Sequence, residues 1–586
     1  MSVVEGVITE NARRVLEARY LRRDSADKII ETPDQLFERV AHGIAEAELL
    51  HGTVADARWW EERFHQMMAS LDFLPNSPTL MNAGTPLGQL SACFVLPIED
   101  RMESIFGTLR DAALIQRTGG GTGFSFSRLR PAGDPVTSTG GSSSGPVSFM
   151  RIYDCATENI KMGGRRRGAN MGILRVDHPD IEDFIHAKCD GVSFRNFNLS
   201  VGATDEFMAA LESGGDLELR HPRDNRVVRT LPARRIFEEI CDAAWSTGDP
   251  GLVFLDTIAR ANPLPACGVI EATNPCGELP LLPYESCNLG SINLTHFVCS
   301  EKTDVNYDRL RAQIHDAVRF LDDVISVNRF PLEAIAHQTL ANRKVGLGVM
   351  GFAELCILLG VSYNSERAVI LAEGLIAFIA REARSASAHL ARQRDVFPNW
   401  ETSVYRERGL RLRNATLTSI APTGTISIIA GTSSGIEPLF ALAYRRRNVL
   451  GNQTMPELNP LLLHHSDRLS PEAMECVSET GRLPADSPER GLFVTALEVS
   501  AEQHIRVQAV FQKHVDNAVS KTINLPTEAS RDDIAEAYWL AYRLGCKGVT
   551  IFRYGSKREA MLELGLGETP EEREHFTKCD PEACRL

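Results

Sequence analysis

A thiol stands between an amide and a carboxylate in the pentapeptide Asn274-Pro275-Cys276-Gly277-Glu278, and Cys287 adds a second thiol eleven residues after Cys276. The proline and the glycine predict a bent loop and not a helix. In an extended or looped segment, residues two positions apart point the same way, so Asn274, Cys276 and Glu278 can face one small volume. The pattern would bring together a redox-active sulfur, a hydrogen-bond donor and a base. A buried cysteine in an ordinary loop explains the pentapeptide alone about as well.

The net charge and the distribution of cysteines exclude several classes of protein. The 586 residues carry a net charge of −14, which argues against a general nucleic-acid or membrane-surface protein. No apolar run reaches the roughly 18 residues that span a bilayer, and the charged N-terminus lacks a signal core. The 13 cysteines are dispersed and no Cys-x-x-Cys occurs, so we expect no disulfide framework and no metal held by protein side chains. These features predict a cytoplasmic protein whose special cysteines are catalytic or redox-exchanging.

Hydrophobic periodicity predicts a helical start and an α/β body. Residues 1–70 contain two amphipathic helical runs, one over 35–50 and one near 59–69. Residues 76–526 alternate short β-rich segments with longer helical patterns. This alternation is typical of a mostly parallel sheet with helical crossovers, either open or closed into a barrel.

Individual segments are also predicted. The clearest strands are 192–201 and 416–421, and the clearest helix is 369–392, where apolar residues recur at intervals of three and four. From about Gly565 the sequence becomes rich in Glu, Thr and Pro, which predicts a mobile tail.

Three loops have residues that suit phosphate groups. Residues 118–123 form a glycine-rich turn without the lysine of a P-loop, so a tight turn is the simpler interpretation. Residues 421–427 place three hydroxyls around exposed amides at a predicted helix start, which suits phosphate and an ordinary capped helix equally. Residues 163–168 set three arginines between glycines, where a phosphate site and a solvated loop both remain open.

Two thiols, Cys579 and Cys584, lie on the polar tail. Structural cysteines are rarely placed in such an exposed segment, so the pair favours a dithiol carrier.

Together these segments resemble the large catalytic chain of ribonucleotide reductases, most closely the adenosylcobalamin-dependent class. The likeness extends over nearly the whole chain and keeps the order of the family's motifs. The matching segments are residues 76–84 with 89–93, 119–123, 165–170, 274–278, 287–289 and 422–427.

The resemblance implies an α/β fold with a ten-stranded barrel over residues 71–560, and with Cys276 on a finger loop that threads its centre. Residues 1–70 would form a helical segment before the barrel, and residues 561–586 a mobile redox tail. A tail of about 24 residues reaches roughly 25–30 Å, enough to enter a barrel mouth.

The resemblance also implies roles for the matched residues. Cys276 would carry the radical and take the 3′-hydrogen of the ribose. Glu278 would accept the 3′-hydroxyl proton, and Asn274 would hydrogen-bond the substrate. Cys93 and Cys287 would supply the electrons and end as a disulfide, which the terminal thiols would reduce again.

Two further sets of residues follow from the resemblance. Those expected to contact the substrate are Ser77, Ala92, Cys93, Gly121, Asn274, Pro275, Cys276, Gly277 and Glu278, with Pro422, Thr423, Gly424, Thr425, Ile426 and Ser427 at the phosphates. Those expected to bind the specificity effector or relay its signal are Asp100, Arg130, Arg165, Arg166 and Arg167.

The radical source is predicted by elimination. The class that relays its radical from a partner subunit uses two adjacent tyrosines, and Phe552 and Arg553 stand at the matching place. The anaerobic class needs a glycyl motif, which the surroundings of Gly555 do not fit, and a ribbon of paired Cys-x-x-Cys. Adenosylcobalamin remains, bound with its own base because no Asp-x-His-x-x-Gly motif offers a histidine. A large subunit that depends on a separate metal-containing subunit is the alternative.

The implied partners are ribonucleotide substrates, with diphosphates expected, deoxynucleotide effectors, and a thioredoxin- or glutaredoxin-type reductant. A homodimer is expected, without nucleic acid or membrane. Only two short helical patterns precede the matching region, so we expect effectors to control specificity without an overall shutdown by dATP.

Overall fold

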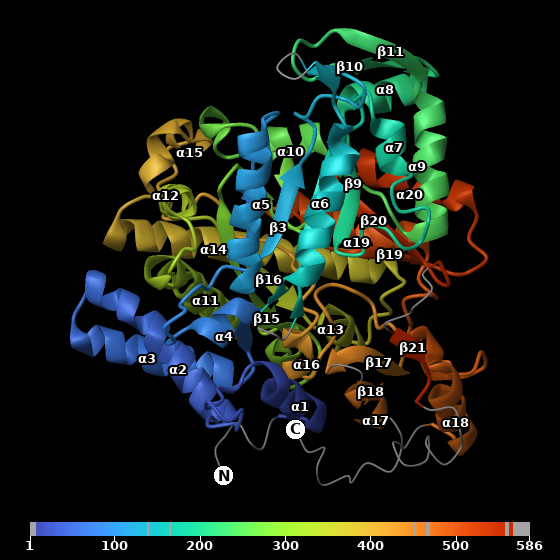
Figure 1. Cartoon of the computed structure of the whole chain (residues 1–586). Helices are drawn as coiled ribbons and strands as arrows, with labels where there is room; N and C mark the ends of the chain where they lie inside the picture. Colours follow the sequence, from blue (N-terminus) through green and yellow to red (C-terminus); the bar gives the residue numbers. More distant parts are fainter. Residues whose placement is uncertain are drawn as a thin grey trace.

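The computed structural model describes residues 8–136, 140–162, 166–450, 453–464, 469–556 and 562–566. Within these ranges its centre is a mixed sheet of ten strands, in the spatial order β1-β15-β2-β3-β8-β9-β12-β20-β19, with β16 also paired to β15 (Figure 1). The strands are β1 (Phe73–Pro75), β2 (Cys93–Leu96), β3 (Gly121–Ser125), β8 (Asn170–Arg175), β9 (Phe197–Ala203), β12 (Gly251–Phe254), β15 (Ser286–Asn293), β16 (Val345–Met350), β19 (Thr522–Leu525) and β20 (Gly548–Arg553).

Parallel pairing dominates one run of this sheet. Strands β2, β3, β8, β9 and β12 pair in parallel, whereas β15 joins β2 and β20 joins β12 in antiparallel fashion. Parallel neighbours need long crossover connections. Helices supply them: α5 (Met102–Arg117) lies between β2 and β3, α6 (Gly145–Asn159) between β3 and β8, and α9 (Ala233–Thr247) between β9 and β12. This confirms the predicted α/β class.

The two faces of the sheet have different neighbours because side chains alternate along each strand. Phe94 and Leu96 of β2 share a core with residues of α5, α9 and α20 (Arg531–Arg543). Cys93 and Val95, which point the other way, share a core with the segment 270–282 and with Cys287. The face that carries Cys93 is therefore covered by the segment that contains the pentapeptide.

Helices α1 (Glu10–Arg19), α2 (Pro33–Ala45) and α3 (Val54–Ala69) form the predicted helical start and lie at the lower end of the molecule in Figure 1. The second predicted run begins earlier than expected, because Thr53 caps α3 with a capping box. Buried charges join these helices to the body. Glu48 accepts hydrogen bonds from Arg319 at 2.5 Å and from Arg394 at 2.6 Å.

Other predicted segments have mixed outcomes. The helix predicted over 369–392 is confirmed by α14 (Glu366–Arg394). The strand predicted over 192–201 is wrong in its first half, since β9 begins at Phe197. Asp190 accepts hydrogen bonds from the amides of Val192 and Ser193, and this local turn replaces strand pairing.

The strand predicted over 416–421 is also wrong as a regular strand. This segment makes only isolated parallel bridges, Leu347 with Thr418 on one side and Ile420 with Val519 on the other. It therefore lies between β16 and the residues that precede β19, without a continuous ladder to either.

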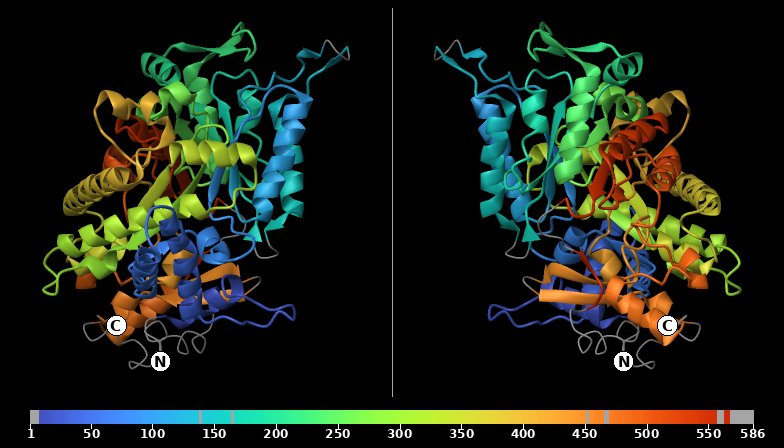
Figure 2. Two further views of the ribbon diagram at one scale, coloured as in Figure 1. Left: turned by 90° about the vertical axis from the view of Figure 1, so that its left-hand side faces the viewer. Right: turned by 90° about the vertical axis from the view of Figure 1, so that its right-hand side faces the viewer.

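Among the described residues, five smaller sheets lie outside the central one, and two of them bear on the predictions. The hairpin of β4 (Pro135–Val136) and β5 (Gly141–Ser142) projects beside α5 and α6 (Figure 2). Strand β17 (Ala443–Leu450) pairs with β18 (Gln453–Leu458) and with β21 (Leu562–Leu564), so the first described residues of the predicted tail are paired. Among the described helices, none has the length and apolar character to cross a membrane.

Candidate active site

The pentapeptide forms the tip of a short hairpin. Strands β13 (Ala272–Thr273) and β14 (Pro280–Leu281) pair antiparallel and leave residues 274–279 as the connecting loop. Asn274 holds this loop closed: its Oδ1 accepts from the amide of Leu279 at 2.9 Å, and its carbonyl accepts from Gly277 at 3.1 Å. Gly277 has φ of +82°, a conformation that favours glycine.

Glycines of β3 let this loop approach the sheet. A Cβ added to Gly123 would overlap the carbonyl oxygen of Thr273, and one added to Gly121 would lie 2.9 Å from the Pro275 ring. From β9, Asn198 Nδ2 donates to the Pro275 carbonyl at 2.8 Å. The loop is therefore held directly against two parallel strands.

The segment 416–421 holds the loop from another side. Ser419 Oγ and the amide of Ala518 both donate to the carbonyl oxygen of Glu278 at 2.9 Å. The loop thus contacts β3, β9 and the region between β16 and β19, which are far apart along the sheet.

Three thiols meet at the loop. Cys93 and Cys287 are directly opposite in the antiparallel pair of β2 and β15, although 194 residues separate them in the chain. Asn274 Nδ2 lies 3.1 Å from Cys93 Sγ. Cys276 is exposed, whereas Cys93 and Cys287 are buried, and none of these three described residues forms a disulfide. The structure therefore brings together Asn274, Cys276, Glu278 and the two buried cysteines.

Burial controls the electrostatics of this group. Burial raises the pKa of Glu278 from 4.5 to about 7, and hydrogen bonding by Asn274 opposes the rise. Its Oε2 has no hydrogen-bond partner among the described residues. Burial also raises the pKa of Cys93 well above 9.0, with further increases from Glu278, Cys276 and Cys287. A carboxyl group with a pKa near neutrality suits a general base.

The loop over residues 422–427 follows Ser419 by only three residues and contains one helical turn, α16 (Ile426–Ile429). Thr423 Oγ1 accepts from the amide of Gly435 at 2.8 Å, and Ser427 Oγ lies 3.1 Å from Ser434 Oγ. Gly424 is exposed and Thr425 is partly exposed. Two of the three predicted hydroxyls thus hydrogen-bond the loop to residues 434 and 435, and the most exposed residue of the loop is Gly424.

Ser77, Ala92 and Gly121 lie on the elements that surround the thiols. The amide of Gly121 donates to the carbonyl of Ala92 at 2.8 Å. Ser77 begins α4 (Ser77–Asn82), and its Oγ lies 2.7 Å from the hydroxyl of Tyr20. Ala92 donates to the Cys287 carbonyl and Gly121 pairs with Cys93, whereas α4 reaches β15 two residues further on, through the amide of Asn76 and the carbonyl of Leu289.

Of the residues predicted for effector binding, Asp100 follows the end of β2 that is opposite Cys93. Asp100 pairs with Arg130 at 2.9 Å and with Arg223 at 2.6 Å. Arg166 and Arg167 form the short strand β7, which pairs with β6 (Lys161–Met162). Arg165, Cys579 and Cys584 lie outside the described residues.

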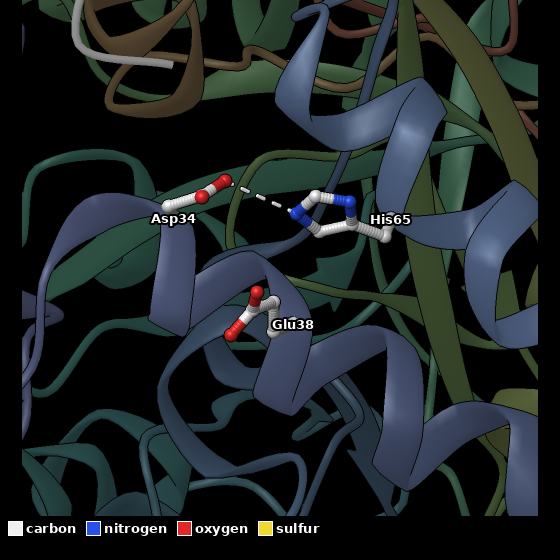
Figure 3. A group of neighbouring side chains, drawn as sticks. All are labelled: Asp34, Glu38 and His65. Atoms are coloured by element: carbon white, nitrogen blue, oxygen red, sulfur yellow. Dashed lines mark hydrogen bonds and ion pairs between the residues drawn. The ribbon is translucent and has the colours of Figure 1, made fainter. Parts of the chain in front are cut away.

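A separate group of possible metal ligands lies on the N-terminal helices. Asp34 and Glu38 of α2 face His65 of α3, with ligand atoms within 4.8 Å of one another (Figure 3). His65 Nε2 lies 3.1 Å from Asp34 Oδ1, and Glu38 is exposed. Two cavities of about 590 and 820 Å³ border this group and not the thiols. The hydrogen bond between His65 and Asp34 explains why these two side chains approach each other.

Family models match both parts of the chain. Residues 7–88 match the all-alpha domain of ribonucleotide reductase, and residues 91–552 match its barrel domain. The chain belongs to the ribonucleotide reductase family. This confirms the resemblance carried by the motifs.

Curated relatives include the vitamin B12-dependent ribonucleoside-diphosphate reductases of Thermoplasma acidophilum and Mycobacterium tuberculosis. The first is 48% identical over 630 residues, covering 97% of this chain and 82% of the relative. The second is 50% identical over 562 residues, covering 94% and 80%. The ribonucleoside-diphosphate reductase subunit alpha of Chlamydia muridarum is 26% identical over 620 residues, covering 92% and 58%.

Several residues that shape the site carry no sequence signal of their own. Asn198 and Ser419 hold the loop in place, and Glu285 and Lys344 lie beside Cys287. Ser419 falls within a predicted strand, but nothing in the sequence shows that it contacts Glu278. Only the folded sheet brings these positions together.

Proposed function

We propose that this chain reduces ribonucleotides, with ribonucleoside diphosphates as substrates, to 2′-deoxyribonucleotides and depends on adenosylcobalamin. The observation that carries the proposal is one loop with Asn274, the exposed Cys276 and the buried Glu278, placed against the opposed pair Cys93 and Cys287. The names of the Thermoplasma and Mycobacterium relatives support both the substrate class and the cofactor.

The sheet is proposed to close as a ten-stranded barrel with the loop of residues 274–279 as a finger in its centre. The isolated bridges of residues 418 and 420 support closure, since they link β16 to the residues before β19. The contacts of the loop to β3, to β9 and to Ser419 support a central position. The proposed parts of the chain remain residues 1–70, 71–560 and 561–586.

The fit of the cofactor is supported by the exposed end of the loop. Cys276 is the exposed thiol of the three, and a Cβ at Gly277 would meet no described atom within 4 Å. The Cys276–Gly277 tip would therefore face the bound group. When bound, adenosylcobalamin supplies the radical chemistry that no ordinary side chain can begin unaided.

The residues of the loop then have separate tasks. Cys276 takes the hydrogen atom from the 3′ carbon of the ribose and returns it at the end. Glu278, with its pKa of about 7, accepts the proton of the 3′-hydroxyl. Asn274 fixes the loop and offers its amide to the substrate.

The two buried thiols supply the electrons and protons that the reduction needs. Loss of the 2′-hydroxyl as water consumes two electrons and two protons, and Cys93 and Cys287 supply both as they form a disulfide. Opposed residues in antiparallel strands have Cα atoms about 4.5–5.5 Å apart, which lies within the range of disulfides. Cys579 and Cys584 are proposed to reduce this disulfide by thiol exchange and to be reduced in turn by a thioredoxin- or glutaredoxin-type protein.

The other predicted residues keep proposed roles. The Gly424–Thr425 backbone is the proposed phosphate contact, because exposed amides at a turn attract anions. The proposed effector region includes Asp100 and Arg130, near the β4–β5 hairpin, and the proposed assembly is a homodimer.

The alternative, a radical relayed from a separate subunit, has less support. Arg553 Nε donates to the Trp245 carbonyl at 3.0 Å, and its guanidinium lies 4.0 Å from the centre of the Trp245 ring. This structural use of Arg553, beside Phe552, gives no redox-active pair at that place.

The test is turnover of the purified chain with ribonucleoside diphosphates and a small dithiol. Adenosylcobalamin should give deoxynucleotide, whereas cyanocobalamin, which lacks the adenosyl ligand, should give none. Product formation without any cobalamin would contradict the cofactor, and no product under any of these conditions would contradict the activity.

A further inference from the structure

A buried ion pair that the proposed mechanism does not use lies beside Cys287. Lys344 Nζ lies 2.6 Å from Glu285 Oε2, and both side chains are at most 2% exposed. Glu285 accepts two further hydrogen bonds at 2.6 Å, from the amide of Leu282 and from Asn342 Nδ2. Three donors therefore hold this carboxylate in one position, and the amine of Lys344 with it.

The ion pair lies where the adjacent strands β15 and β16 begin, next to Cys287, the second residue of β15. Strands β15 and β16 are parallel with Asn288 opposite Val345, so Cys287 and Lys344 are adjacent across the ladder. Cys287 Sγ lies 3.6 Å from the Lys344 carbonyl oxygen. Glu285 directly precedes β15, and both Glu285 and Lys344 lie close enough to Cys287 to affect the pKa of its thiol. The amine bound to Glu285 thus lies beside Cys287.

The charges around the two buried thiols differ. Burial raises the pKa of Cys287, and Lys344 opposes this rise, while Glu285 and Glu278 add to it. Burial raises the pKa of Cys93 as well, but Glu278 and the two other thiols add to the rise, and the main opposing effect is the hydrogen bond from Asn274. A cation is therefore among the main groups that act on Cys287, whereas the five largest effects on Cys93 include no cation.

We infer that Lys344 is a positioning residue that makes Cys287 the leaving thiolate when the Cys93–Cys287 disulfide is reduced, so that the reductant attacks Cys93. The inference rests on the proposed function, in which these two cysteines end each turnover as a disulfide. In thiol–disulfide exchange, the sulfur that is more stable as thiolate leaves faster. The exposure of the two thiols also favours attack on Cys93, since Cys93 is 6% exposed and Cys287 is fully buried.

The exchange balances with a dithiol as reductant. One thiolate of the dithiol attacks Cys93 Sγ, the bond to Cys287 breaks, and the electron pair leaves on Cys287 beside the Lys344 ammonium. The second sulfur of the dithiol, as thiolate, then attacks the first sulfur of the same dithiol, which is bonded to Cys93. The bond to Cys93 breaks, and Cys93 leaves as thiolate. The two protons of the dithiol end on Cys93 and Cys287, and the dithiol becomes a disulfide.

The first experiment uses the wild-type chain. The purified protein is oxidised with diamide, treated briefly with the monothiol 2-mercaptoethanol, quenched with acid, and alkylated before peptide mass spectrometry. We expect the mercaptoethanol adduct on Cys93 to exceed that on Cys287 at least tenfold. An equal distribution, an adduct mainly on Cys287, or failure of diamide to join the two cysteines would overturn the inference.

The second experiment separates charge from structure. In Lys344→Met the preference for Cys93 should fall at least tenfold, and reduction by a small dithiol should slow by a similar factor. In the matched variant Glu285→Gln, which keeps the cation and removes the anion, the preference should be kept or should increase. The inference would be overturned if the preference for Cys93 fell in both variants, or if it stayed unchanged in Lys344→Met.

A double variant without either charge serves as a control for misfolding. Lys344→Met leaves Glu285 as an unpaired buried charge, whereas Lys344→Met with Glu285→Gln removes both charges and is better tolerated. This double variant should lose the preference as the single variant does, and a retained preference would count against the inference. The adduct position is independent of turnover, so failure of the chain to make deoxynucleotide would contradict only the proposed function.

Discussion

Glu278→Gln should inactivate the chain and at the same time stabilise it above neutral pH. The carboxyl group is buried, one of its oxygens has no partner among the described residues, and its pKa is raised from 4.5 to about 7. A folded-state pKa above the unfolded value means that the folded chain holds the proton more tightly. The associated stability is complete below pH 4.5 and is lost as the pH rises to about 7.

The stability that Glu278→Gln should gain follows from the unfolded and folded pKa values of Glu278. At about 1.4 kcal/mol per pH unit, the difference between 4.5 and about 7 corresponds to roughly 3 kcal/mol. The neutral glutamine does not pay this cost, so the variant should gain about that amount at pH 8 and less than about 1 kcal/mol at pH 5. For cooperative unfolding of 586 residues, roughly 3 kcal/mol shifts the thermal midpoint by about 3 °C.

The measurement is the thermal midpoint of wild type and variant at pH 5 and pH 8, with Glu475→Gln as control. Glu475 is exposed on α18 (Pro471–Thr480), so its replacement should not change the midpoint difference between the two pH values. Product formation by the pre-reduced wild type should rise about tenfold per pH unit below pH 7 and level off above it. A variant that gains the same stability at both pH values, or wild-type activity that is flat from pH 5.5 to 8, would refute the assignment of a buried base with a raised pKa.

Three other variants test separate parts of the proposal. Cys276→Ser should abolish deoxynucleotide formation with nucleotide binding intact, as checked by product assay and equilibrium binding, and measurable product would remove Cys276 as the radical carrier. Cys579→Ser with Cys584→Ser should allow about one product per pre-reduced chain with a protein dithiol donor, while a small dithiol restores cycling; normal cycling with the protein donor would rule out the tail. Gly123→Ala should reduce activity at least tenfold because its Cβ would displace the loop, whereas Gly374→Ala, in open space on α14, should leave activity unchanged; equal activities would show that the loop does not depend on β3.

The sequence predicts the chemistry of the loop better than its surroundings. The pentapeptide identifies a loop that carries a thiol, an amide and a carboxylate, and the periodicity of 369–392 identifies α14 within three residues at either end. These succeed because they depend on local residue order. The strand predicted over 192–201 fails in its first half, since the hydrogen bonds of Asp190 compete with pairing and apolar content does not reveal them.

Long-range pairing is the part that residue order does not determine. Cys93 and Cys287 become opposed only because β15 turns antiparallel against β2, and Lys344 reaches Cys287 only because β16 pairs with the other edge of β15. The segment 416–421 shows the same limit. Its composition favours a strand, yet its hydrogen bonds are divided between β16, the residues near 518 and the carbonyl of Glu278.

The burial of Glu278 and the exposure of Cys276 arise from one backbone feature. Asn274 and Glu278 are both buried and linked to the sheet, so strict alternation would also bury the residue midway between them. The turn closed by Asn274, with Gly277 in the left-handed region, instead leaves Cys276 at the exposed tip. A base needs burial to raise its pKa, whereas a thiol that reacts with a bound cofactor needs access. Residue 277 must therefore accept a positive φ for both conditions to hold two residues apart, and glycine accepts it without strain.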